Sequence, residues 1–138
     1  MQFTARQGRL NIYLKVLRLG RDLQVLCGGG ASHIGAVALA APAQVYGLQQ
    51  GQHAQADQAA QPGQTAARLL ALPGHKEDAL ALRMAQSISQ SLHCAVCVSA
   101  GIHYDNITRA EIAQVEQMVQ DLTQRCISAL KKDSECLR

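Results

Sequence analysis

One apolar stripe near the end of the chain sets the strongest constraint on its fold. Thr108 and Glu111 stand three residues apart, the spacing of a capping box that begins a helix. The stripe behind them has helical spacing and consists of Ile112, Val115, Val119, Leu122, Cys126 and Leu130. A helix with one apolar face must bury that face against another layer. The rest of the chain must therefore supply a surface for it.

Short apolar segments earlier in the chain predict that this surface is a β-sheet. Residues 10–18 alternate between two faces, and residues 20–22 have the composition of a hairpin turn. Residues 93–100 are apolar on both faces, which is typical of a central strand. The predicted strands cover residues 10–18, 23–27, 33–41, 67–72 and 93–100.

A second helix is predicted over residues 76–92, where Ala81, Met84 and Ile88 share one face. The element order β-β-β-β-α-β-α predicts an α+β fold: a single domain over residues 1–138, with two helices packed on a mixed, mainly antiparallel sheet of about five strands. Residues 49–64 are nearly all Gln, Ala, Gly, His and Asp, so a flexible surface loop is expected there.

Composition excludes several classes of protein. The net charge of +3 is mild, the basic residues are scattered and aromatic residues make up only 3%, so nucleic acid is not an expected partner. No apolar run approaches the ~20 residues that span a bilayer, and the N-terminus carries no apolar leader, so no membrane association is expected. The five cysteines are an odd number without an export signal, which predicts reduced thiols in a cytoplasmic protein.

Three polar clusters follow predicted strands, and each combines glycine with histidine. They occupy residues 28–35 (GGGASHIG), 73–78 (PGHKED) and 101–106 (GIHYDN). Consecutive glycines let backbone N–H groups approach an anion, and a helix start attracts one, so the first two clusters are candidate phosphate sites. The structural alternatives are a bulged turn at the glycines and acidic residues that only compensate the helix dipole. The glycines match neither common nucleotide-binding motif.

Glu77 lies four residues before Ala81, so its carboxylate is expected to point toward the end of the sheet. With His33 and His75, Glu77 also forms a candidate divalent-metal site assembled across loops. Such a site would support a metal-dependent hydrolase or amidohydrolase in which Glu77 acts as the base. Cys94 and Cys97 are not expected to share a metal, because residues three apart on a strand face opposite sides.

The three clusters, in this order, resemble the LpdD-like family of prenylated-flavin chaperones. The resemblance rests on G-G-x-x-S-H-I-G-A-V-A-L, L-P-G-H-K-E-D and G-I-H-Y-D-N-I, and it covers most of the chain from Cys27 onward. It implies a non-catalytic carrier that binds prenylated FMN, or FMN, and delivers or helps mature it for a UbiD-type (de)carboxylase acting on gallate-like acids. A flavin prenyltransferase is a further implied partner.

The same resemblance implies cofactor contacts from all three clusters, with Tyr104 as the favoured aromatic partner of the flavin ring. The implied residues are Gly28, Gly29, Gly30, Ser32, His33, Gly35, His75, Lys76, Glu77, His103, Tyr104 and Asp105. A structural subunit that docks on a decarboxylase without holding flavin is a further hypothesis. The amphipathic last helix could serve an interface in each case, including that of a homo-oligomer.

Overall fold

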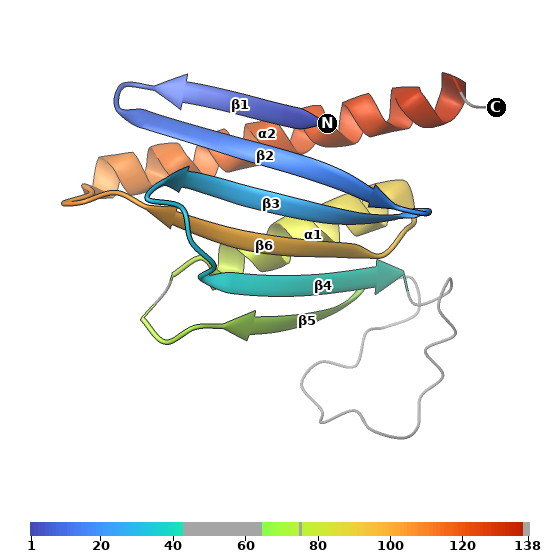
Figure 1. Ribbon diagram of the computed structural model, residues 1–138, viewed down its shortest axis with the longest axis horizontal. Coiled ribbons are helices and arrows are strands. Elements are labelled where there is room, and N and C mark those ends of the chain that lie inside the picture. The colour runs from blue at the N-terminus through green and yellow to red at the C-terminus, as the bar shows by residue number, and fades with distance from the viewer. Residues whose placement is uncertain (43–64, 75, 137–138) are drawn as a thin grey trace.

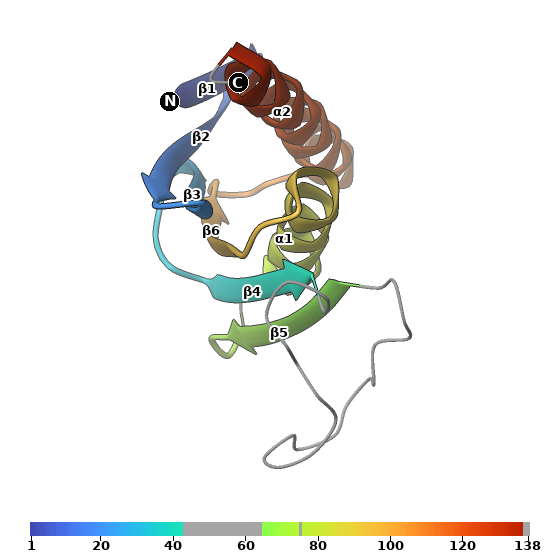
Figure 2. The ribbon, with the colours of Figure 1, turned by 90° about the vertical axis from the view of Figure 1, so that its right-hand side faces the viewer.

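The computed structural model describes residues 1–42, 65–74 and 76–136, which form one six-stranded sheet with two helices on one of its faces (Figures 1 and 2). The strands are β1 (Gln2–Gln7), β2 (Leu10–Leu19), β3 (Asp22–Gly30), β4 (Ala36–Pro42), β5 (Thr65–Ala71) and β6 (Val96–His103), and the helices are α1 (Asp78–Leu92) and α2 (Arg109–Cys136). The predicted α+β class is confirmed. The predicted loop at residues 49–64 lies outside the described residues.

The strand order β1-β2-β3-β6-β4-β5 contains one parallel pair, β3 with β6. Every other neighbouring pair is antiparallel. The parallel pair runs from Leu23 opposite Val96 to Gly30 opposite His103, so both strands end at the same edge of the sheet. β4 begins at this edge, because Ala36 pairs with Ala100. The sequence clusters that follow β3 and β6 therefore meet.

β1 is not among the strands that the sequence predicts. Its half-buried side chains are Phe3 and Ala5, which lie opposite Leu14 and Ile12 of β2. Arg125 of α2 donates a hydrogen bond to the Thr4 carbonyl at 3.1 Å. As an edge strand, β1 is held by backbone pairing to one neighbour, so it needs few apolar residues and leaves a weak sequence signal.

Four predicted strand boundaries are wrong. The strand predicted to begin at residue 33 begins at Ala36, because residues 31–35 form the connection from β3. The segment predicted to begin at residue 93 begins as a strand at Val96, because His93 adopts the left-handed conformation (φ 53°) that ends α1. The strand predicted to end at residue 27 continues through the three glycines to Gly30. β6 likewise extends through His103, so the exit loop is shorter than expected.

α2 begins at the predicted capping box. Thr108 Oγ1 accepts a hydrogen bond from Glu111 N at 3.1 Å, and the Glu111 carboxylate accepts one from Thr108 N at 3.0 Å. The stripe from Val115 to Leu130 is buried, but Ile112 is 39% exposed and does not belong to it. Among the described residues, no helix is long and apolar enough to cross a membrane.

The core lies between the helices and the sheet. Its best-buried side chains are Leu10, Ile12, Leu14, Val25, Ile88, Val96, Val98, Leu122 and Cys126. Burial raises the pKa of the Cys27 thiol to about 12 and that of Cys126 to about 11. These thiols stay protonated near neutral pH and act as small apolar side chains.

The connection from β3 to β4 crosses the end of β6, which lies between them in the sheet (Figure 1). Gly35 N donates a hydrogen bond to Ala100 O at 2.9 Å, which holds the crossing in place. A Cβ atom at Gly101 would overlap the backbone carbonyl of His33. Glycine at position 101 therefore makes the crossing possible.

We expect Gly101→Ala to lower the free energy of unfolding by about 1–3 kcal/mol, because the crossing backbone must shift to make room. Ser99→Ala, on the same strand and face, is the control and should stay within about 0.5 kcal/mol of the parent protein. Urea unfolding measures both. Equal midpoints for the two variants would contradict this account of the crossing.

Candidate functional site

The structure brings one predicted residue from each polar cluster to the edge where β3 and β6 end. His33 lies in the β3–β4 crossing, Glu77 at the start of α1, and His103 at the end of β6. His33 Nε2 lies 3.6 Å from Glu77 Oε1. The His33 and His103 rings lie 6.4 Å apart between centroids and nearly perpendicular, at 74°. We call these three residues the strand-end cluster.

Glu77 turns toward the sheet, as the sequence predicts. Its side chain is only 12% exposed, and Oε1 accepts a hydrogen bond from Ile102 N at 3.3 Å. Glu77 makes no side-chain capping bond to α1, whereas Asp78 accepts a hydrogen bond from Ala79 N at 2.7 Å. A Cβ atom at Gly35 would lie 2.6 Å from Glu77 Oε2, so glycine there leaves space for the carboxylate.

The two histidines differ in their surroundings. The His33 side chain is 27% exposed, and its Nδ1 lies 3.2 Å from the carbonyl of Ala31. His103 is 57% exposed, and its Nε2 lies 3.1 Å from the carboxylate of Asp105, which is itself 90% exposed. Imidazole groups can donate or accept hydrogen bonds. The cluster therefore presents one sheltered and one solvent-facing imidazole.

Tyr104 holds the loop after β6 against the start of β2. Its hydroxyl donates to Asn11 O at 2.9 Å and accepts from Asn11 N at 2.8 Å. The Arg9 guanidinium lies over the Tyr104 ring, 5.8 Å from its centroid, and donates to Asp105 O at 3.0 Å. Arg9 also forms two hydrogen bonds of 2.8 Å with the Glu111 carboxylate. Tyr104 thus has a structural role that its sequence context does not reveal.

The three glycines of β3 serve close packing. A Cβ at Gly28 would overlap the hydroxyl of Tyr13, and one at Gly30 would overlap the carbonyl of His103. Gly30 also has a positive φ of 60°. All three glycines are in register with β6, so the free loop begins only at Ala31. Their contact with a phosphate stays a prediction.

The predicted metal trio cannot be assembled from the described residues, because His75 lies outside them. Across residues 1–42, 65–74 and 76–136, no three His, Cys, Asp or Glu side chains are grouped to hold a metal ion. His33 and Glu77 do lie together, so two of the three predicted ligands meet.

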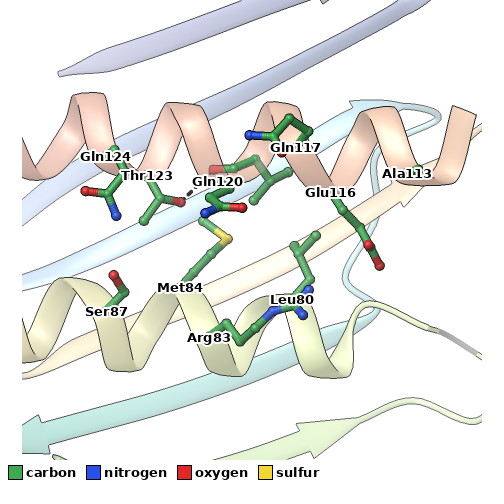
Figure 3. A pocket seen from close by; sticks show the side chains of 11 residues that line it. Leu80, Arg83, Met84, Ser87, Ala113, Glu116, Gln117, Gln120, Thr123 and Gln124 are labelled. Atoms are coloured by element: carbon green, nitrogen blue, oxygen red, sulfur yellow. Dashed lines mark hydrogen bonds between the residues drawn. The ribbon is translucent and has the colours of Figure 1, made fainter.

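A cavity of about 360 Å³ lies elsewhere, between α1 and α2 (Figure 3). Its lining is mostly amide and aliphatic and consists of Leu80, Arg83, Met84, Ser87, Ala113, Glu116, Gln117, Val119, Gln120, Thr123 and Gln124. None of the strand-end cluster lines it. Because the histidines and the buried carboxylate gather at the strand ends, we place the candidate site there.

The family model of the prenylated flavin chaperone LpdD-like domain matches residues 6–131, so the chain belongs to that family. Protein LpdD of Lactiplantibacillus plantarum is 39% identical over 57 residues, which are 41% of this chain and 42% of that protein. The match thus spans less than half of the relative's length.

A solved structure has a similar fold. It is described as a novel chaperone complex for yeast 20S proteasome assembly, and the chain matches it with a TM-score of 0.52 and 12% sequence identity. The match covers 96% of this chain and 94% of that one. At this identity the likeness concerns the fold alone.

The Arg9–Glu111 pair predicts a specific acid sensitivity. Hydrogen bonds from Arg9 and then from Thr108 lower the pKa of Glu111 from 4.5 to about 2. A lowered folded-state pKa gives stabilisation that is complete above the unfolded-state value and is lost as pH falls through the folded-state value. Glu111→Gln should therefore lower Tm at neutral pH and flatten the loss of Tm between about pH 4.5 and 2. Thermal melts over this range, with Glu116→Gln as control, test it; matching acid profiles for the two variants would contradict it.

Tyr104→Phe should lower the free energy of unfolding by about 1–2 kcal/mol, because it removes both hydrogen bonds to Asn11. Tyr13→Phe is the control, since the Tyr13 hydroxyl makes no hydrogen bond within the part of the chain that the structure describes. Urea unfolding compares the two, and a larger loss for Tyr13→Phe would refute the structural role of Tyr104.

Proposed function

We propose that this protein binds prenylated FMN at the strand-end cluster and carries it to a UbiD-type (de)carboxylase. The observation that carries the proposal is the convergence of His33, Glu77 and His103, one from each family motif, within a chain that matches the chaperone family over residues 6–131. A site assembled from three separated motifs fits a ligand that touches all of them.

The surroundings of the cluster suit a ligand with a polar and an apolar end. Ile34, next to His33, is 61% exposed, and Leu72, which donates a backbone hydrogen bond to Gly35, is 50% exposed. Exposed aliphatic side chains beside convergent polar groups are typical of a cofactor site. In this arrangement Ile34 and Leu72 cover the ring system, which shields a reactive flavin from water.

Charge at this edge limits where the phosphate can bind. The Glu77 carboxylate repels a phosphate dianion at the first turn of α1, and Arg9 already pairs with Glu111. His103 and the exposed Lys76 are the groups that offer positive charge or N–H donors. We assign phosphate binding to these two side chains. His33, whose imidazole Glu77 orients, contacts the cofactor away from its phosphate.

The test is co-expression of the full chain with a flavin prenyltransferase, followed by anaerobic purification, native mass spectrometry and absorbance spectra. His103→Asn should raise the dissociation constant of the cofactor about tenfold, the value of a hydrogen bond to a charged group, and His33→Asn should also lower occupancy because it removes the oriented imidazole. The control is His93→Asn at the far end of α1, where asparagine tolerates the left-handed conformation and occupancy should be unchanged. Cofactor-free protein despite a verified supply would refute the proposal.

Delivery needs a second measurement. Loaded protein should restore activity to a cofactor-free UbiD-type decarboxylase under anaerobic conditions, and His33→Asn protein should restore less. Binding to the decarboxylase without any bound flavin would favour the structural-subunit alternative. Stoichiometric divalent metal with turnover of a small amide would favour the hydrolase alternative.

A further inference from the structure

One face of the sheet lies opposite the helices (Figures 1 and 2). Two rows of side chains cross it, and each row has one residue from β2, β3, β6, β4 and β5. We call it the open face. One row reads Leu17, Gln24, Cys97, Leu39 and Arg68 across the strands, and the other reads Lys15, Leu26, Ser99, Val37 and Leu70. Neither helix packs on it.

The open face is apolar enough to need a partner. Leu39 is 51% exposed, Leu70 is 74% exposed and Leu17 is 45% exposed, although all three lie in regular strands. Large apolar side chains gathered on one face mark an interaction surface. We propose that the open face binds a second copy of this chain, so that two sheets pack face to face between two outer layers of helices.

The two rows are self-complementary, as a two-fold interface requires. Each row has one basic residue at one end and a leucine at the other, in opposite order. A two-fold axis along β6 reverses each row onto itself, so Lys15 meets Leu70 of the second copy and Arg68 meets Leu17. An axis across the strands, between the rows, sets Lys15 opposite Leu17 and Arg68 opposite Leu70. In both arrangements an aliphatic stem covers a leucine while the charged end reaches water.

The size of the face also suits a dimer. With strands about 4.8 Å apart and about 3.3 Å per residue, the two rows and their flanks project to roughly 500 Å². Side chains add to this area, which brings it near the ~800 Å² per partner of a stable interface. The small residues Cys97 and Ser99 at the centre permit the ~10 Å spacing of packed sheets.

Neither row contains a carboxylate. The effect of salt on binding therefore distinguishes a second copy of this chain from a partner with an acidic surface. Two copies bring Lys15 and Arg68 of each chain to one interface, so salt should strengthen their association by screening like charges. A different protein with an acidic docking surface would bind more weakly as salt rises.

Sedimentation velocity on the full chain at micromolar concentration, at low and high salt, tests the proposal. The parent protein should be a dimer whose dissociation constant does not rise with salt. Leu39→Asp should raise that constant about 100-fold or more, because it places a carboxylate in the apolar centre of both copies. Ile112→Asp on α2 is the control, an exposed apolar residue on the other side of the molecule.

Circular dichroism checks that the Leu39→Asp protein is folded. If it is not, Leu70→Asp takes its place as the test variant. A monomer at every concentration would overturn the proposal, and so would a dimer that Ile112→Asp dissociates and Leu39→Asp does not. A monomer that binds a decarboxylase through the open face, and more weakly in salt, would assign the face to a different partner. Cofactor occupancy measured on the same variants keeps this result separate from the proposed function.

Discussion

The parallel pairing of β3 with β6 is the constraint on which the rest of the molecule depends. It brings the ends of both strands to one edge and forces the β3–β4 connection to cross β6, where Gly101 leaves room for the His33 backbone. Parallel strands also require a long connection, which β4, β5 and α1 supply. The start of α1 therefore returns to the same edge and places Glu77 beside His33. One pairing thus explains both the fold and the meeting of the three motifs.

Much of this fold could be predicted, since the capping box of α2 and the alternation of β2 are local patterns. β1 could not, because an edge strand with two half-buried side chains has little periodicity. Strand order is a non-local property, and alternation along one strand contains no information about its neighbour. The end of β6 was missed for a related reason: Gly101 reads as a loop residue, but its small size serves a crossing chain.

The candidate site was predictable in its residue types but not in their roles. Spacing along α1 placed Glu77 toward the sheet, and the structure confirms this. Nothing local indicates that the Tyr104 hydroxyl bonds to Asn11, 93 residues away, or that Arg9 pairs with Glu111. The glycines at positions 28–30 suggest an anion-binding loop from the sequence, but they lie in β3. There they pack against Tyr13 and His103, contacts that no local pattern reveals. In the proposal the site lies at this edge of the sheet, and the assignment of each residue to ring or phosphate rests on charge and exposure.

Hydrogen–deuterium exchange of the full chain with and without prenylated FMN, under anaerobic conditions, tests the central claim most directly, because it locates the ligand without any substitution. The account predicts protection of residues 31–35 and 101–106 and of the start of α1, with unchanged exchange in the middle of α1 and α2. Protection confined to residues 80–87 and 113–124, around the cavity between the helices, would contradict it and place the cofactor there.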